Sequence, residues 1–351
     1  MRKILVDISS HGFGHLAQTA PVINHLKLLN PQIEVIVRTN YASTLVKSFF
    51  DFDIDCDDFP FEPTLEMHGP VSVNLEKSDH LICKFFNNWN DNISYRRGLL
   101  QVIRPDLLIS NIPYGSLEAA KELEIPSIAL CSYNWFETQK FFNLGSETIR
   151  SQTMQAYSDA KVFIQPQPHM PMPYLYNTHS VGPIARQGVN KQYQLRQRFN
   201  ISTHIPIILV TLGGIPGDRK ISLPLDNRYF WLIDERLPIH HPYSIRTSDC
   251  DMNFIDLLAS CDLVVTKEGY GAVVEAACNG KKILMLSRIN WLETPFFIEW
   301  AESNTCCQIL PIDHTAEQFE AGLQALLAEE QPSIIKPTGI SEAANIISDF
   351  Y

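Results

Sequence analysis

The sequence has no apolar run that approaches the roughly 18 residues a membrane-spanning helix needs. No charged segment followed by a long apolar stretch precedes the first predicted strand, which starts at Lys3. We therefore expect a cytoplasmic protein without a transmembrane segment or a secretory leader.

The sequence also has few features of a metal or nucleic-acid binder. Its eight cysteines form no C-x-x-C pair and several lie inside apolar runs, so they are expected to be buried free thiols rather than zinc ligands or disulfides. The adjacent histidines His240 and His241 point in different directions and no carboxylate spacing accompanies them, so they do not have the pattern of a metal site. A net charge of −11 without a basic stripe excludes nucleic acid as an expected partner. We expect no metal and no bound cofactor.

The remaining pattern is one of alternating strands and helices. A length of 351 residues with 45% hydrophobic residues favours two domains over one. A first βα series fills residues 1–165, and a segment with four prolines begins the predicted linker 166–190. A second series occupies 191–335, and a final helix in 336–351 could pack back on the first domain. The expected class is α/β, with two Rossmann-like doubly wound domains.

A strand–loop–helix unit in the second domain is the most informative stretch. Asp262–Thr266 is a short apolar strand, Lys267–Gly271 is a loop with two glycines, and Ala272–Asn279 is a predicted helix. Glycines let the backbone approach a ligand, and the helix N-terminus presents free N–H groups, which suits a diphosphate. Glu275, one turn further, could accept hydrogen bonds from a ribose. The alternative is an ordinary turn followed by a solvated glutamate.

A second glycine loop follows the first strand of the chain. Lys3–Ile8 breaks into S-S-H-G-F-G-H before a helix that starts at Leu16, which places this loop at the carboxyl end of a strand, where open α/β sheets bind ligands. Residues 57–78 form a long polar excursion, and loops of that size are often functional.

Taken together, these motifs resemble a known family. The combination of H-G-F-G-H at His11–His15, T-K-E-G-Y-G-A-V-V-E ending at Glu275, and S-R-I-N-W-L-E-T-P-F at Ser287–Phe296 is similar to glycosyltransferases of the GT-B architecture. Within them it most resembles the branch that contains the amino-terminal domain of L-arabinokinase and the lipid-linked GlcNAc transferase of peptidoglycan synthesis. The resemblance implies two Rossmann-like domains that face a central cleft.

The resemblance also implies roles for residues on the donor side. A sugar nucleotide's diphosphate would be held at Gly213, Gly214, Gly269, Tyr270, Gly271, Ala272 and Arg288. Glu275 would bind the donor ribose, and Glu293 would contact hydroxyls of the transferred sugar. Lys267 could assist Arg288 in stabilising the leaving diphosphate.

On the acceptor side, the resemblance makes His15 and His11 the candidates for proton transfer. Asn111 ends a strand where many relatives have an aspartate, and an amide cannot stabilise an imidazolium by charge. Asp7 or a residue of 57–78 is therefore an alternative base. The remaining acceptor-side residues would be Gly12, Phe13, Gly14 and Trp135.

We therefore expect metal-independent transfer of a sugar from a nucleoside-diphosphate sugar, with UDP as the expected nucleotide, to a small-molecule or lipid acceptor. A nucleotide-sugar epimerase of the same fold and a catalytically silent sugar-nucleotide-binding module are the alternatives. Neither the acceptor nor the oligomeric state follows from the sequence.

Overall fold

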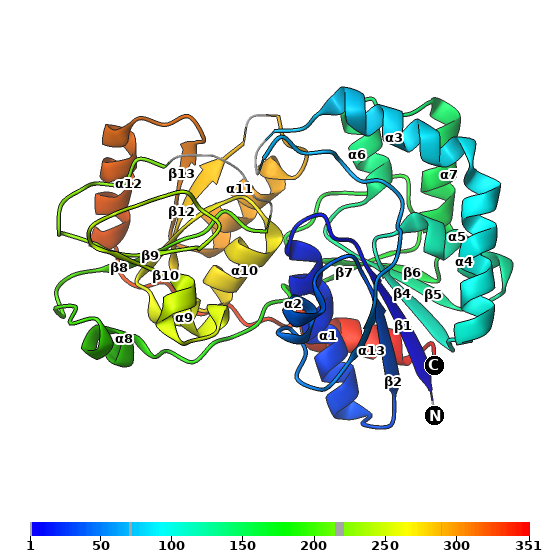
Figure 1. The fold of residues 1–351 in the computed structure, drawn as a ribbon, viewed down its shortest axis with the longest axis horizontal. Coiled ribbons are helices and arrows are strands. Elements are labelled where there is room, and N and C mark those ends of the chain that lie inside the picture. Colours follow the sequence, from blue (N-terminus) through cyan, green and yellow to red (C-terminus); the bar gives the residue numbers. More distant parts are fainter. Residues whose placement is uncertain (1, 70–71, 215–220, 289) are drawn as a thin grey trace. The chain divides into compact units, whose positions relative to one another are not determined.

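The computed structural model describes residues 2–69, 72–214, 221–288 and 290–351. The chain forms two compact units, each built on its own sheet (Figure 1). The first unit comprises Met1–Met67, Val73–Ile184 and Thr338–Tyr351, and the second comprises His68–Ser72 and Ala185–Pro337. No helix within the described residues is long and apolar enough to cross a membrane.

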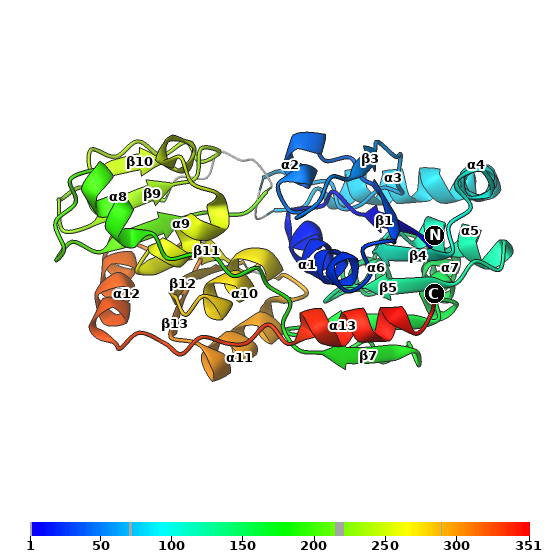
Figure 2. The same cartoon turned by 90° about the horizontal axis from the view of Figure 1, so that it is seen from below.

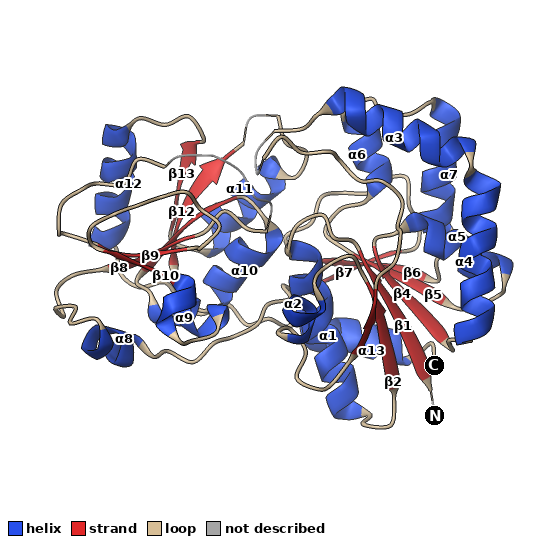
Figure 3. Ribbon diagram, viewed as in Figure 1, coloured by secondary structure: helices blue, strands red, loops and turns tan. Residues whose placement is uncertain are grey.

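The first unit is a seven-stranded parallel sheet in the order β3-β2-β1-β4-β5-β6-β7, with helices packed on it (Figure 3). Its strands are β1 (Lys3–Ile8), β2 (Glu34–Arg38), β3 (Asp55–Asp57), β4 (Leu107–Asn111), β5 (Ser127–Leu130), β6 (Val162–Pro166) and β7 (Thr178–Val181). Its helices are α1 (Gly14–Leu29), α2 (Ser43–Lys47), α3 (Leu75–Asn87), α4 (Trp89–Ile103), α5 (Tyr114–Glu122), α6 (Trp135–Phe141), α7 (Glu147–Ser158) and α13 (Gly339–Ser348).

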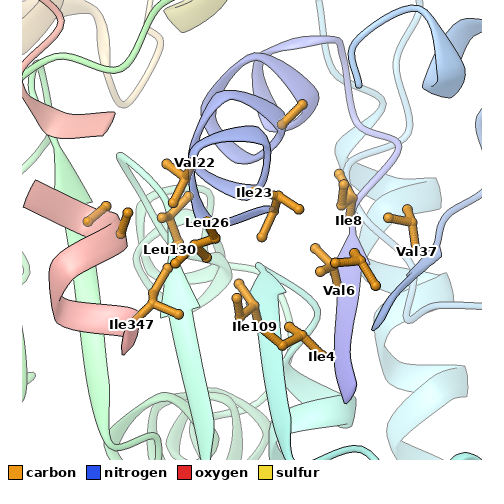
Figure 4. Packing of buried hydrophobic residues seen from close by; sticks show 14 of the residues in the cluster. Ile4, Val6, Ile8, Val22, Ile23, Leu26, Val37, Ile109, Leu130 and Ile347 are labelled. Carbon is orange, nitrogen blue, oxygen red and sulfur yellow. The ribbon is translucent and has the colours of Figure 1, made fainter. Parts of the chain in front are cut away.

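The core of the first unit lies between the sheet and the helix pair α1 and α13. Strand side chains such as Val6 and Ile109 pack with Ile23 and Leu26 of α1 and with Ile347 of α13 (Figure 4). The inner strands β4, β5 and β6 are buried along their length because helices cover a parallel sheet on its faces, which explains their continuous apolar runs. The last helix of the chain thereby completes the core of the first unit, alongside α1 and β7 (Figure 2).

The second unit is a six-stranded parallel sheet in the order β10-β9-β8-β11-β12-β13. Its strands are β8 (Ile207–Val210), β9 (Phe230–Ile233), β10 (Ser244–Arg246), β11 (Leu263–Lys267), β12 (Lys282–Ser287) and β13 (Cys307–Pro311). Its helices are α8 (Gln192–Arg198), α9 (Phe254–Ser260), α10 (Tyr270–Cys278), α11 (Thr294–Asn304) and α12 (Ala316–Ala328), with a 3-10 turn at Thr247–Cys250.

Both sheets have the strand order of a doubly wound fold. The chain builds each sheet outward from β1 or β8 in one direction, and then returns to add β4 or β11 on the other side of the same strand. The order therefore reverses between β1 and β4 in the first sheet and between β8 and β11 in the second. Ligands of open α/β sheets bind at such switch points, beyond the carboxyl ends of the strands.

The structure divides two helices that the sequence pattern presented as single. The stretches 81–102 and 137–158 are each typical of one continuous helix, but α3 ends at Asn87 and α6 ends at Phe141. In the second case the cause is visible, because Asn143 and Gly145 have φ values of 53° and 66°, which end a helix. The Ser146 side chain then caps α7 by accepting from the N–H of Ile149.

Two strands were not anticipated. β7 lies inside the stretch 166–190 that we expected to be a linker, and its sequence T-H-S-V has exposed polar residues because it forms the edge of the sheet. β10, at the edge of the other sheet, has only three residues. Short polar edge strands show neither an apolar run nor a clear alternation, so the pattern does not reveal them.

Candidate functional site

His15 lies at the switch point of the first sheet. It is the second residue of α1, which follows β1, while Asn111 is the last residue of β4. The two strand ends are held together by the N–H of Ser9, which donates to the carbonyl oxygen of Asn111 over 2.8 Å. The His15 side chain is only 3% exposed, and its Nδ1 lies 2.8 Å from Oδ1 of Asn111.

The orientation of Asn111 fixes the tautomer of His15. The amide nitrogen of Asn111 donates to Oγ1 of Thr19 over 2.9 Å and to Oε1 of Gln18 over 3.2 Å. Its oxygen therefore faces the imidazole, so Nδ1 of His15 carries the proton and donates. The other ring nitrogen, Nε2, is left with a lone pair and accepts from the Tyr133 hydroxyl 3.2 Å away.

Burial determines the charge of this imidazole. Removal from water lowers the pKa of His15 to about 4, and the hydrogen bond with Asn111 opposes that shift only in part. His15 is therefore neutral at neutral pH, with Nε2 able to accept a proton.

The other acceptor-side residues surround His15. The ring of His11 meets Trp135 edge-on with centroids 5.4 Å apart, and Trp135 is itself buried at the start of α6. Gly12, Phe13 and Gly14 form the half-buried turn into α1; Gly12 has a φ of 86°, and its carbonyl accepts from the hydroxyl of Tyr41. The structure thus brings both histidines and Trp135 together.

Tyr133 was not singled out by sequence, although it lies two residues before Trp135, which was expected on the acceptor side. It follows β5, the neighbour of β4, and its half-buried ring contacts both His15 and Trp135. Spacing does not distinguish it from the other aromatic residues nearby. Only the strand order shows that this tyrosine is placed against His15.

Two of the alternative bases, Asp7 and Glu62, are bonded to basic side chains within the protein. Asp7 is fully buried and forms a two-point ion pair with Arg38, with distances of 2.7 and 2.6 Å. In the excursion 57–78, of which residues 70–71 lie outside the described part, Glu62 is buried against Arg96 and accepts from the N–H of Gly115 over 3.0 Å. Asp7 is therefore a structural residue, and Glu62 anchors the excursion to α5.

The second unit places its glycines at the corresponding switch point. Gly213 and Gly214 follow β8, and Gly213 has a φ of 81°, which glycine adopts without strain. Gly269 is the N-cap of α10, directly after β11. Gly271 and Ala272 lie half-buried in the first turn of α10, whereas the Tyr270 side chain is buried and packs on Phe297.

The first turn of α10 contains no acidic residue. Among the residues that the structure describes, no side chain caps this helix, and the carboxylate of Glu268, which precedes the N-cap residue, is bonded to Arg288. An α-helix carries about half a positive charge at its N-terminus, which favours an anion there. The turn after β8 and the N-terminus of α10 thus present a position suited to a phosphate group.

Arg288, predicted to bind the diphosphate, is held inside the protein. Its Nε lies 3.0 Å from Oε1 of Glu268, its Nη2 donates to the Glu268 carbonyl over 3.1 Å, and its guanidinium stacks on Trp291 at 3.6 Å. Only 6% of Arg288 is exposed. Glu268 also accepts from the hydroxyl of Thr294, so this cluster ties the loop after β11 to the start of α11.

The acidic residues assigned to the donor differ in their surroundings. Glu275 is buried in α10, and its Oε1 lies 2.6 Å from Nε of Arg186. One carboxylate oxygen is therefore engaged within the protein, which leaves only the other for a ribose. Glu293 is the half-buried N-cap residue of α11.

Comparisons with known proteins identify the fold. No family model matches the chain. It is 22% identical over 318 residues to L-arabinokinase from Arabidopsis thaliana, a match that covers 85% of this chain but only 29% of that protein. Among solved structures, the calicheamicin glycosyltransferase CalG4 has a TM-score of 0.65 at 15% identity, with 99% of this chain and 98% of that chain covered. The chain has the GT-B fold.

GT-B proteins of two chemistries resemble this chain. The glycosyltransferase of kitacinnamycin has a TM-score of 0.68 at 13% identity and covers 99% of this chain and 98% of its own. UDP-GlcNAc 2-epimerase from Neisseria meningitidis, bound to UDP-GlcNAc, has a TM-score of 0.58 at 15% identity with the same coverage. A shared fold does not choose between transfer and epimerisation, so the function must be argued from the residues.

Proposed function

We propose that the protein is a glycosyltransferase that takes a sugar from a UDP-linked donor and transfers it, without a metal ion, to a small-molecule or lipid acceptor. The observation that carries the proposal is the uncapped N-terminus of α10 at the switch point of the second sheet, beside the glycine turn after β8. The choice of UDP rests on structural neighbours described as complexes with UDP or a UDP-sugar.

The positive groups near the proposed diphosphate position support a reaction without a metal ion. A leaving diphosphate gains negative charge, which a metal ion or protein groups must stabilise. Here the positive end of α10 and the nearby Lys267 ammonium would supply that stabilisation. The neutral His15, with a lone pair on Nε2, would accept the proton of the acceptor hydroxyl.

An epimerase is the second candidate, because UDP-GlcNAc 2-epimerases match 99% of the chain in fold. It would use the same diphosphate position and need no acceptor. A silent sugar-nucleotide-binding module is the third, favoured by the amide of Asn111 where an imidazolium would need a carboxylate.

The diphosphate position is tested by a charge placed in the first turn of α10. UDP and UDP-sugars should raise the melting temperature of the wild type, since binding to the folded state stabilises by mass action, by about 2.7 kcal/mol at 100 times the Kd. Ala272→Asp puts a carboxylate where the phosphates would lie, so this variant should show no such shift.

Ala316→Asp is the matched control, because Ala316 is exposed in the first turn of α12 in the same unit. It should keep the full shift, and uridine at the same concentration should produce a much smaller one. An undiminished UDP shift in Ala272→Asp would show that α10 does not hold the diphosphate.

A further inference from the structure

The two basic side chains beside the glycine turns are in different situations. The Arg288 guanidinium is bonded to Glu268 at two points and stacked on Trp291, so its charge and its planar donor groups serve the protein itself. Moving it onto a phosphate would leave the buried Glu268 carboxylate without its partner, which is costly. Arg288 therefore organises the loop rather than reaching a ligand.

Lys267, the last residue of β11, is the basic residue whose side chain lies beside the glycine turns. Its Nζ is 3.8 Å from the position that a Cβ on Gly269 would take, and its Cε is 3.8 Å from the equivalent position on Gly213. Apart from each glycine, its chain neighbours and adjacent helix backbone, no other heavy atom of the described residues comes within 4 Å of either position. The side chain of Lys267 thus lies at the space between the two glycine turns, at the N-terminus of α10.

Within the described part of the chain, no carboxylate forms a salt bridge with Lys267. Burial, together with the Arg288 guanidinium, lowers the pKa of the Lys267 ammonium to about 7, and the carboxylates of Glu268 and Glu293 oppose this shift only in part. Glu268 is itself engaged by Arg288 and Thr294. A cation next to a positive helix end is unfavourable until an anion binds both.

We infer that Lys267, and not Arg288, is the side-chain cation that binds the diphosphate of the sugar nucleotide, between Gly213 and Gly269. The inference rests on the proposed function and specifies which residue of the donor site contributes the charge. Binding of the diphosphate would restore the ordinary, protonated state of this lysine. UDP binding above neutral pH therefore takes up a proton at Lys267.

Calorimetry with UDP tests the assignment on the full chain. Lys267→Met should bind UDP about 10- to 100-fold more weakly than the wild type, the loss expected for a hydrogen bond from a charged group. Lys336→Met is the matched control, because Lys336 is exposed on the same unit, and its affinity should equal that of the wild type.

Two readouts separate direct binding from a structural effect. At pH 8, titrations in buffers of different ionisation enthalpy should show that the wild type takes up more protons on binding UDP than Lys267→Met does. The affinity of the wild type should also weaken from pH 7 to pH 9 as free Lys267 loses its proton. Lys267→Arg should weaken less, because a guanidinium stays charged throughout.

The outcomes distinguish this inference from the function it rests on. A wild type that binds no UDP would overturn both. A wild type that binds UDP, with Lys267→Met equally tight and equal proton uptake in the two proteins, would overturn the assignment of Lys267 and leave the proposed function standing. Should Lys267→Met fail to fold, Lys267→Arg takes its place in the proton-uptake comparison at pH 8, because a guanidinium cannot take up a proton there, and equal uptake by Lys267→Arg and the wild type would overturn the assignment.

Discussion

The imidazole of His15 is held in one tautomer by an amide and not by a carboxylate. Asn111 accepts from Nδ1, so Nε2 can take a proton, but the resulting imidazolium gains no opposite charge from Asn111. With a pKa of about 4, the neutral form is present throughout the physiological range, although it is a weak base. The geometry therefore supports proton acceptance, and the electrostatics limit its strength.

Replacing His15 tests the role of this nitrogen. Positioned acid–base catalysis contributes roughly 100- to 10,000-fold, so His15→Ala should lower turnover by that order while UDP affinity stays nearly unchanged. The measurement is the initial rate of UDP release together with UDP affinity from calorimetry. His11→Ala is the comparison and should cost less, because the His11 ring packs against Trp135. A His15→Ala enzyme with full turnover would rule the role out.

Asn111→Asp should change the titration of His15 in a defined direction. A carboxylate beside Nδ1 favours the imidazolium, so the pKa of His15 should rise from the wild-type value of about 4, which burial sets. In NMR titrations the wild-type ring should stay neutral from pH 5 to pH 8, and the variant's ring should titrate at higher pH. A faster Asn111→Asp enzyme would indicate that imidazolium stability limits the rate. A wild-type His15 that titrates near its ordinary value would contradict the buried network.

At the scale of elements, α5 in the first unit and α10 in the second each follow a strand at the switch point of their own sheet, and they differ in what their N-termini bind. At α5, which follows β4, the N–H of Gly115 donates to the buried carboxylate of Glu62. At α10, which follows β11, no side chain in the described part of the chain caps the helix, and the first turn has no acidic residue. The protein thus supplies its own anion to α5 and not to α10, which is the arrangement expected if α10 binds an external one.

The packing of α13 provides a stability prediction for the first unit. Ile347 is fully buried in the core between α13, α1 and the sheet (Figure 4). Ile347→Ala should lower the free energy of unfolding by about 2–5 kcal/mol, because it removes buried carbon atoms and leaves a cavity. Val102→Ala, at a side chain that is 80% exposed on the same unit, should change it by less than about 0.5 kcal/mol. Urea unfolding measures both, and equal effects would show that α13 does not contribute to the core.

Most elements could be predicted because their local signals are strong. The apolar run and the glycine loop before α10 located β11 and α10 to within a few residues. β7 could not be found, since its pairing with β6 depends on a neighbour distant in sequence rather than on its own composition. The same limit applies to side chains. A glycine in the sequence marks a place where a ligand can come close to the backbone. Only the folded chain shows that Arg288 is bonded to Glu268 and that Tyr133 contacts His15.

At the scale of the whole molecule, the GT-B fold accommodates both transfer and epimerisation, and the two differ in the fate of the sugar. A transferase breaks the bond between the anomeric carbon and the diphosphate, releases UDP, and forms a bond to an acceptor oxygen. An epimerase returns a UDP-sugar with altered stereochemistry, and a silent module returns the donor unchanged. Following an isotopically labelled sugar therefore separates all three.

The most direct test is to incubate the protein with ¹³C-labelled UDP-sugars, a pool of small-molecule and lipid acceptors, and excess EDTA. Mass spectrometry and NMR then follow the label. We expect that UDP is released and the label appears on an acceptor despite the chelator, and that His15→Ala loses this transfer. Label found only in unchanged or epimerised UDP-sugar, or transfer that stops with EDTA and returns with added Mg²⁺ or Mn²⁺, would contradict it.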